Sequence, residues 1–351
     1  MKKLSLIALL VLAAFALVGC QTTTTTAEKE FKVDGEFTAF VTSVHSNNAQ
    51  QVTMVTVTIE DGEIKGYKID ARQATRTVDN KGTEDTADDT YAFAWNASTK
   101  VELGFNYKMH YNTYKATLAD PATATLEGYQ AWLTANSKNE WHTQAALIEA
   151  YWLANGVDAM EYNAETKVIS NIAGVTVKNS GYSDLAKEAI ALAKAGKFQA
   201  IKCTGTDLYI ATMTVAADGT KSELKLDVLQ LNSQRTDKSK FEWNTETKQE
   251  KGFNYKMHYN TYRASLTDPD TATLEGYQAW LTANSKLEWF QQANIITDYV
   301  MANGWNAEYK ANAGGVGMTT DGTNALAGTA GVSIKSQSYF DVLSYLFAKV
   351  K

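Results

Sequence analysis

This sequence of 351 residues contains few histidines and cysteines, and it has no excess of positive charge. Of its four histidines, His110 and His258 each stand alone, without the ligand spacing of a metal site. The net charge of −6 argues against a nucleic-acid partner. We also find no Ser/His/Asp set, no glycine-rich nucleotide-binding motif and no pair of carboxylates in a shared frame. The sequence therefore predicts neither a metal site nor a catalytic centre of these kinds.

Long apolar runs are missing too, apart from one near the N-terminus. Residues 4–18 are apolar and uncharged and follow two lysines. The run is shorter than the roughly 20 residues of a membrane-spanning helix and has the length of the apolar region of a secretion signal. It ends in Leu-Val-Gly-Cys, which resembles the lipobox of bacterial lipoproteins. We therefore expect a signal peptide over 1–19, a lipid on Cys20 and a Thr-rich tether over 20–33. An ordinary secretion signal with a chance cysteine is the alternative.

The second cysteine, Cys203, has no partner if Cys20 carries a lipid. The sequence therefore predicts a fold without an intramolecular disulfide. The neighbours of Cys203 favour a half-buried position on a strand. A redox thiol is the alternative, although no cationic motif nearby marks this cysteine as activated.

What the sequence does contain is an internal repeat. Residues 104–138 and 252–286 align without a gap and are identical at 31 of 35 positions. Weaker similarity continues on both sides, with an offset of 148 residues in the middle and about 157 at either end. A period this long indicates a duplicated domain and not a solenoid repeat. We therefore predict two domains, 34–197 and 198–351, and expect each to fold on its own.

Each half begins with alternating apolar and polar residues around an Asp-Gly turn. In the first half residues 52–59 and 64–69 flank Asp61-Gly62, and in the second half residues 208–215 and 224–229 flank Asp218-Gly219. Alternation on both sides of an Asp-Gly pair predicts a β-hairpin.

Helical patterns follow the hairpin in each half. Residues 137–140 and 285–288 have the Ser-x-x-Glu form of a capping box. Behind the first of them, apolar residues recur on one helical face as far as Asn155-Gly156, a typical helix stop; these residues are Trp141, Ala145, Ile148 and Trp152. A closing helix is expected from Ser183 in the first half and around 342–347 in the second. Strands followed by helices predict the α+β class, with an antiparallel sheet and packed helices in each domain.

Two segments have an unusual composition. Residues 105–111 are dense in aromatic and polar side chains, which either form a wall for a flat heterocyclic ligand or pack under one another as a loop. Their repetition does not decide between the two, because a recent duplication also preserves a neutral sequence. Residues 79–89 are acidic and either form a solvated loop or hold Ca²⁺, although they lack the spacing of an EF-hand.

The most specific motifs lie near the end of each half. Residues 170–176 (SNIAGVT) and 327–333 (AGTAGVS) each precede an expected helix. They resemble the flavin-attachment segment of the FMN-binding domain family, in which Asp, two residues, Ser or Thr, Gly and Ala often precede a Thr or Ser. With the hairpin and the Tyr-Lys-Met block upstream (residues 107–109 and 255–257), residues 34–351 look like the tandem FMN-binding lipoproteins of Gram-positive bacteria. Here Ser170 and Ala327 replace the leading Asp, and valine precedes the hydroxyl residue.

This resemblance implies FMN as the cofactor, with Thr176 and Ser333 as the hydroxyls that a flavin transferase joins to its phosphate. Non-covalent binding and loss of flavin binding are the alternatives. Glycine turns bring backbone N–H groups close to a phosphate, and the redox chemistry belongs to the flavin ring. The further residues implied are Gly174, Val175, Gly331 and Val332 in the two turns, and Tyr107, Met109, Tyr255 and Met257 beside the ring.

The family also implies a function. We expect a lipid-anchored electron carrier in extracellular electron transfer, on the outer face of the bacterial membrane, and not a turnover enzyme in its own right. Its partners would be the membrane, a membrane redox donor and a flavin transferase. A solute- or peptide-binding lipoprotein whose aromatic blocks form a groove is one rival. A cell-envelope interaction protein without a small ligand is another.

Overall fold

The computed structural model describes residues 29–313 and 317–351, so Cys20 and the signal peptide 1–19 lie outside the described residues. Its strands form antiparallel sheets of order β1-β2-β3-β4, β5-β6-β7 and β8-β9. Together with the helices, these sheets confirm the predicted α+β class. The strands are β1 (Gly35–Val44), β2 (Gln50–Glu60), β3 (Glu63–Asp79), β4 (Thr90–Trp95), β5 (Lys197–Thr204), β6 (Asp207–Val215), β7 (Lys221–Leu229), β8 (Lys310–Ala311) and β9 (Met318–Thr319).

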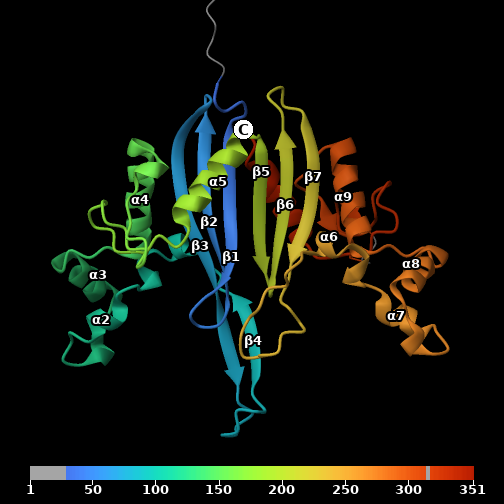
Figure 1. Cartoon of the computed structure of the whole chain (residues 1–351), viewed down its shortest axis with the longest axis horizontal. Coiled ribbons are helices and arrows are strands. Elements are labelled where there is room, and N and C mark those ends of the chain that lie inside the picture. The colour runs from blue at the N-terminus through green and yellow to red at the C-terminus, as the bar shows by residue number, and fades with distance from the viewer. Residues whose placement is uncertain (1–28, 314–316) are drawn as a thin grey trace, which may run out of the picture.

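The longer helices cover the sheets. Helix α5 packs on β1 and β2 and α10 on β5 and β6, while α4 and α9 cover β3 and β7. In Figure 1, α5 lies in front of the central strands and α4 and α9 lie on the outer sides. In the part of the chain that the structure describes, no helix has the length and apolarity to cross a membrane. The helices are α1 (Lys100–Leu103), α2 (Tyr111–Lys115), α3 (Leu126–Ala135), α4 (Trp141–Asn155), α5 (Tyr182–Lys194), α6 (Lys248–Lys251), α7 (Tyr259–Ala264), α8 (Leu274–Ala283), α9 (Trp289–Asn303) and α10 (Ser338–Ala348).

Both predicted hairpins are confirmed. In β2, Val55, Val57 and Ile59 are fully buried, and the residues between them are half-buried, as expected for a strand with one face on the core. Asp61 and Gly62 both adopt positive φ angles, 58° and 76°. Two consecutive positive φ angles match the twist of the flanking strands, which explains why Asp-Gly occupies this turn.

Strand β1, which the sequence pattern did not reveal, lies beside β5, the strand predicted around Cys203, at the centre of the molecule (Figure 1). The rings of Phe37 on β1 and Phe198 on β5 are 4.2 Å apart. The backbone N–H of Glu36 donates to the carbonyl of Lys349 at 3.0 Å. A Cβ atom on Gly35 would lie 2.4 Å from the same carbonyl oxygen, so only glycine allows this close approach.

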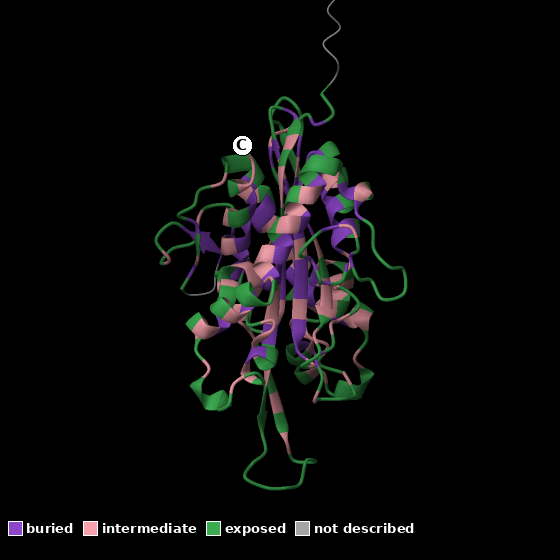
Figure 2. Ribbon diagram, turned by 90° about the vertical axis from the view of Figure 1, so that its left-hand side faces the viewer, coloured by how far each residue is buried: buried purple, intermediate pink, exposed green. Residues whose placement is uncertain are grey.

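One hydrophobic core runs through both halves of the chain. Its buried residues extend from Phe31 to Leu346 and include side chains from β1, β2, β5, β6 and the helices that cover them. Figure 2 shows this buried layer along the centre of the molecule. Because side chains from both halves form this core, we expect each half to contribute to the stability of the other. The domain boundary at 197/198 falls at the start of β5.

A smaller cluster joins the two halves a second time. The hairpin of β3 and β4 projects from the sheet, and Phe93 on it packs edge-on against Phe241 at 5.5 Å. Arg76 on the hairpin donates to the carbonyl of Ser239 at 2.9 Å. The indole of Trp243 donates to the carbonyl of Ser43 at 3.2 Å. Residues 231–243 thus fasten the second half to the first.

The repeated segments form two projecting arms, residues 104–138 and 252–286, one on each side of the body (Figure 1). Each arm has its own small core, separate from the main one. Helices α3 and α8 cover the same ten residues of the repeat and are capped alike by Thr125 and Thr273. The buried residues are Tyr114, Tyr129 and Leu133 in the first arm and Tyr262, Tyr277 and Leu281 in the second.

The prediction of serine caps for α4 and α9 is wrong. Ser137 and Ser285 adopt positive φ angles of 50° and 49°, outside the helices. The N-cap residues are Glu140 and Glu288, whose carboxylates accept from the first N–H of each helix at 2.8 Å. The remainder of the helix prediction is confirmed, because the predicted face of α4 is buried and α4 ends before Gly156.

Candidate functional site

A buried glutamine connects the predicted attachment residue to the aromatic block in the first half. Gln144 on α4 is fully buried, and its side-chain carbonyl accepts from the backbone N–H groups of Thr176 and Val177 at 2.6 and 2.9 Å. The Thr176 hydroxyl also donates to this oxygen at 3.3 Å. The amide nitrogen of Gln144 lies 3.6 Å from the sulfur of Met109. Two residues that are 67 positions apart in the sequence therefore meet at one side chain.

The second half has the same arrangement. Gln292 on α9, 1% exposed, accepts from the N–H groups of Ser333 and Ile334 at 2.6 and 3.1 Å and from the Ser333 hydroxyl at 3.2 Å. Its amide nitrogen lies 3.5 Å from the sulfur of Met257. Thr176 and Ser333 themselves are exposed at the surface. Each half thus fixes one exposed hydroxyl on a buried glutamine.

The glycine turns leave fewer free N–H groups than the sequence led us to expect. Gly174 and Gly331 have positive φ angles of 79° and 86°, as the predicted turns require. The N–H groups of Val175 and Val332 donate to carbonyls three residues earlier, and the next two N–H groups in each half donate to the glutamine. The hydroxyl, and not a row of backbone N–H groups, is therefore the group that each turn presents to solvent.

The base of each arm is tied to a buried carboxylate. Glu288 is fully buried and accepts from the Tyr277 hydroxyl at 2.6 Å and from the Met257 N–H at 3.0 Å. Burial and this carboxylate raise the pKa of the Tyr277 phenol. Glu140 makes the equivalent bonds to Tyr129 and Met109. Since Gln292 and Glu288 both reach Met257, the position of the Tyr-Lys-Met block is fixed from two sides.

A lysine lies beside each predicted ring-contact tyrosine; Lys100 in the first half is half-buried and Lys248 in the second half is buried. The Lys100 amine is 4.8 Å from the centre of the Tyr107 ring and 5.0 Å from that of Trp141. Lys248 has the same relation to Tyr255 and Trp289, at 4.8 and 5.2 Å. Burial lowers the pKa of both amines to about 8. Ammonium groups held over aromatic faces in this way place a positive charge beside the block.

The second half has a pocket next to its attachment turn. The pocket has a volume of about 440 Å³ and lies where the arm meets the body, with Gly331 at one side. Its lining mixes apolar side chains with amides, hydroxyls and one ammonium group. The lining residues are Phe253, Gln278, Leu281, Thr282, Ser285, Lys286, Leu287, Gln291 and Gly331. The volume lies within the roughly 300–1,000 Å³ of small-molecule sites.

The other candidates of the sequence do not join this site. Cys203 is half-buried on β5, as predicted, and burial raises the pKa of its thiol to about 12. Residues 80–88 of the acidic loop are exposed at the tip of the β3–β4 hairpin. Over residues 29–313 and 317–351, no group of three or more His, Cys, Asp or Glu side chains is placed to hold a metal ion.

The sequence analysis did not identify the residues that hold the turns and the Tyr-Lys-Met blocks in place. These are the two glutamines, the two lysines and the two glutamates that cap α4 and α9. One signal was available. Helices α4 and α9 share only seven of fifteen residues, yet Gln144 and Gln292 are among the shared ones. A polar residue at equivalent positions on the buried faces of both helices marks a structural contact.

Comparison with protein families, with curated proteins and with solved structures finds no match to this chain. The residues and their geometry therefore carry the functional argument.

Proposed function

We propose that this chain is a lipid-anchored, extracytoplasmic FMN-binding protein that carries electrons, with one flavin in each half. The observation that carries the proposal is the pair of exposed hydroxyls, Thr176 and Ser333, each held on a buried glutamine beside a Tyr-Lys-Met block. A phosphate ester on either hydroxyl oxygen replaces one weak hydrogen bond. It leaves the two backbone bonds to the glutamine intact, so the turn keeps its shape.

The surroundings of each hydroxyl suit a flavin ring. In the second half the pocket beside Gly331 has apolar walls from Phe253 and Leu287 and nearby amide groups. Gly331 is two residues from Ser333, which a chain spans in about 7 Å. The ammonium groups of Lys100 and Lys248 favour the negatively charged form of a reduced flavin nearby. The protein would thus hold the ring and tune its potential.

Visible absorbance of single-site variants tests this proposal. We expect the chain made in a host with a flavin transferase to be yellow and to carry two flavins. Thr176→Ala and Ser333→Ala should each remove one of them, because each hydroxyl is the only attachment atom in its half, and the double variant should be colourless. Thr166→Ala, which removes another exposed hydroxyl of the first half, should leave the absorbance unchanged.

A colourless wild-type protein, under conditions that load a proven member of the FMN-binding family, would contradict the proposal. The pocket beside Gly331 would then be the first place to seek a solute or peptide ligand, as the rival interpretation requires. Flavin that co-purifies but is released on denaturation would replace covalent attachment by non-covalent binding.

The proposed location depends on Cys20. We expect Cys20→Ala to abolish lipidation and leave the precursor uncleaved, because the thiol is the atom that accepts the lipid. Incorporation of labelled palmitate and membrane fractionation measure this directly. Cys203→Ala is the matched control and should retain full label. Wild-type labelling of the Cys20 variant would rule out the lipoprotein assignment.

A further inference from the structure

Two adjoining pockets beside the β6–β7 turn play no part in the proposed flavin site. One has a volume of about 440 Å³ and is largely apolar, and the other, of about 310 Å³, is lined by lysines. Both include Gly219 and Lys221 at the β6–β7 turn, so they meet there. Together they form one cleft with an apolar part and a cationic part.

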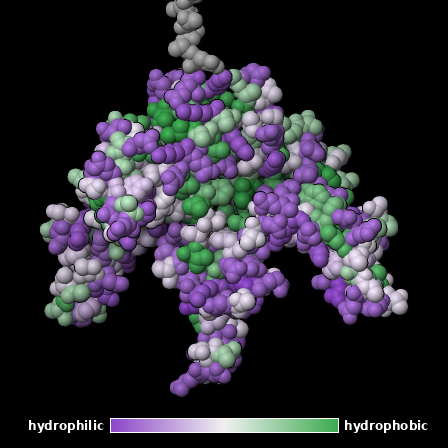
Figure 3. Space-filling model, in the orientation of Figure 1, coloured by the Kyte–Doolittle hydropathy of each residue, from purple (hydrophilic) through white to green (hydrophobic). Residues whose placement is uncertain are grey.

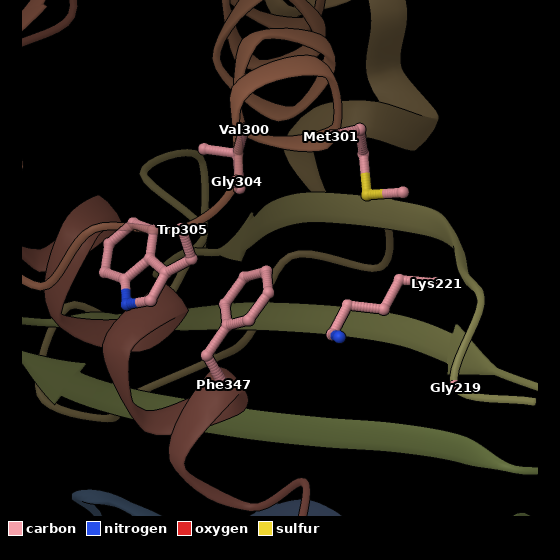
Figure 4. A pocket seen from close by; sticks show the side chains of 7 residues that line it. All are labelled: Gly219, Lys221, Val300, Met301, Gly304, Trp305 and Phe347. Carbon is pink, nitrogen blue, oxygen red and sulfur yellow. The ribbon is translucent and has the colours of Figure 1, made fainter.

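The apolar part has aromatic walls. The rings of Trp305 and Phe347 stack in parallel, with 5.5 Å between their centres and 9° between their planes. Figure 4 shows Phe347 between Trp305 and Lys221, with Val300 and Met301 at the end of α9 above them. Met301 is 37% exposed, so an apolar group entering here removes apolar surface from water.

The cationic part carries four exposed lysines, which are Lys29, Lys32, Lys221 and Lys351. Among the described residues, the one acidic side chain in its lining is that of Asp34, which accepts from the N–H groups of Asp61 and Gly62 at 2.9 and 3.0 Å. Lys351 pairs with Glu60. Hydrophilic residues cover this end of the molecule, where the described chain begins (Figure 3). An anionic group is the ligand that such a lining favours.

The corresponding place in the first half is closed. The repeat aligns Lys221 with Ile64, Trp305 with Val157 and Phe347 with Ile190. Val157 is buried in the main core, and Ile64 and Ile190 pack against it. The second half thus has two rings and an ammonium group where the first half has packed aliphatic side chains. The apolar part of the cleft is therefore a property of the second half, while Lys29 and Lys32 of the cationic part come from the N-terminal segment.

From these contacts we infer that the cleft binds an anionic amphiphile, with its acyl chain between Trp305, Phe347 and Met301 and its carboxylate or phosphate head among the lysines. Lys221 lies at the junction of the two parts and contacts the head. The combined volume of the two parts lies within the range of small-molecule sites, roughly 300–1,000 Å³. Two sources have this chemistry, a lipid of an anionic membrane and a free fatty acid.

Quenching of Trp305 by a brominated acyl chain tests the inference. The protein used is the chain without residues 1–20, which retains every residue of the main core because this core begins at Phe31. It is titrated with dibromostearate below its micelle concentration, and with vesicles of dibrominated phosphatidylglycerol or phosphatidylcholine. We expect the acid to quench tryptophan fluorescence and Trp305→Phe to abolish most of the quenching. Lys221→Gln should raise the concentration for half-quenching about fivefold, the equivalent of roughly 1 kcal/mol for one lysine near an anionic surface.

Lys65→Gln removes an exposed lysine near the start of β3, the matching strand of the first half, and should leave the titration unchanged. Quenching by phosphatidylglycerol vesicles as well as by the acid identifies a membrane lipid as the source. Quenching by the acid alone identifies a soluble amphiphile. The inference is overturned if the acid does not quench the fluorescence, or if it quenches the Trp305→Phe variant as strongly as the unaltered chain. Equal quenching by phosphatidylcholine, with no effect of Lys221→Gln, overturns the assignment of an anionic head.

Discussion

Replacing Glu288 by alanine is expected to lower the free energy of unfolding by about 3–5 kcal/mol, because three donors lose their buried acceptor. These donors are the Tyr277 hydroxyl and the N–H groups of Met257 and Trp289, all within 3.1 Å of the carboxylate. Water cannot replace the carboxylate without entering the core, since Glu288 is fully buried. Urea unfolding followed by tryptophan fluorescence measures the change.

Two further variants isolate the cause. Glu275→Ala removes an exposed carboxylate from the first turn of α8 and should cost less than about 1 kcal/mol. Tyr277→Phe keeps the buried ring and removes one of the three donors, so its effect and that of Glu288→Ala should combine to less than their sum. A change below about 0.5 kcal/mol for Glu288→Ala would show that the arm is not anchored through this carboxylate.

Separating the halves is expected to abolish cooperative unfolding in both. Residues 30–197 and 198–351, made as two chains, would each expose one side of the shared core, including Phe37 or Phe198. They would also lose the backbone bond between Glu36 and Lys349. Exposed apolar surface of this extent removes the main stabilising contribution to a fold. Near-ultraviolet circular dichroism during thermal unfolding, on each half and on an equimolar mixture, measures the effect.

The mixture is the control in this experiment. If the shared core is the reason that the halves fail alone, mixing them should restore the near-ultraviolet spectrum of the intact chain. Cooperative melting of either half at the temperature of the intact chain would contradict this expectation. It would support the independent domains that the sequence repeat suggested.

The sequence predicted the parts of the fold that depend on local patterns. Alternation around Asp61-Gly62 and Asp218-Gly219 identified both hairpins, because a glycine with a positive φ angle, Gly62 or Gly219, is needed in each turn. The apolar face of α4 and its end before Gly156 were likewise predicted from local sequence patterns. Strand β1 was not predicted, because several consecutive residues are buried there and its sequence does not alternate cleanly between apolar and polar residues.

The capping error has a physical explanation. Ser137 to Glu140 fits the capping-box pattern, but Glu140 is needed by Tyr129 and Met109 from the arm. The chain therefore places the glutamate at the cap and turns through a positive φ angle at Ser137. A tertiary contact has overridden a local preference. Tertiary contacts of this kind leave no periodic signal in the sequence.

In the candidate site, too, some features were predicted from local sequence patterns and others depend on tertiary contacts. Helices α5 and α10 follow the segments of Thr176 and Ser333, as the sequence predicted. The approach of these two segments to Met109 and Met257 depends on Gln144 and Gln292, which reach across from another helix. Contacts over more than 30 residues follow from packing and not from spacing. Only the repetition of the two glutamines on buried helix faces hinted at them.

Peptide-level mass spectrometry tests the central claim, that FMN is attached to Thr176 and Ser333. The chain is produced with a flavin transferase, denatured and digested, so that only covalent flavin remains on the peptides. The account predicts FMN adducts on the peptide that contains Thr176 and on the one that contains Ser333. Each adduct should be missing in the corresponding alanine variant. Adducts on other residues, or no adduct on protein from a host that flavinylates a proven family member, would contradict it.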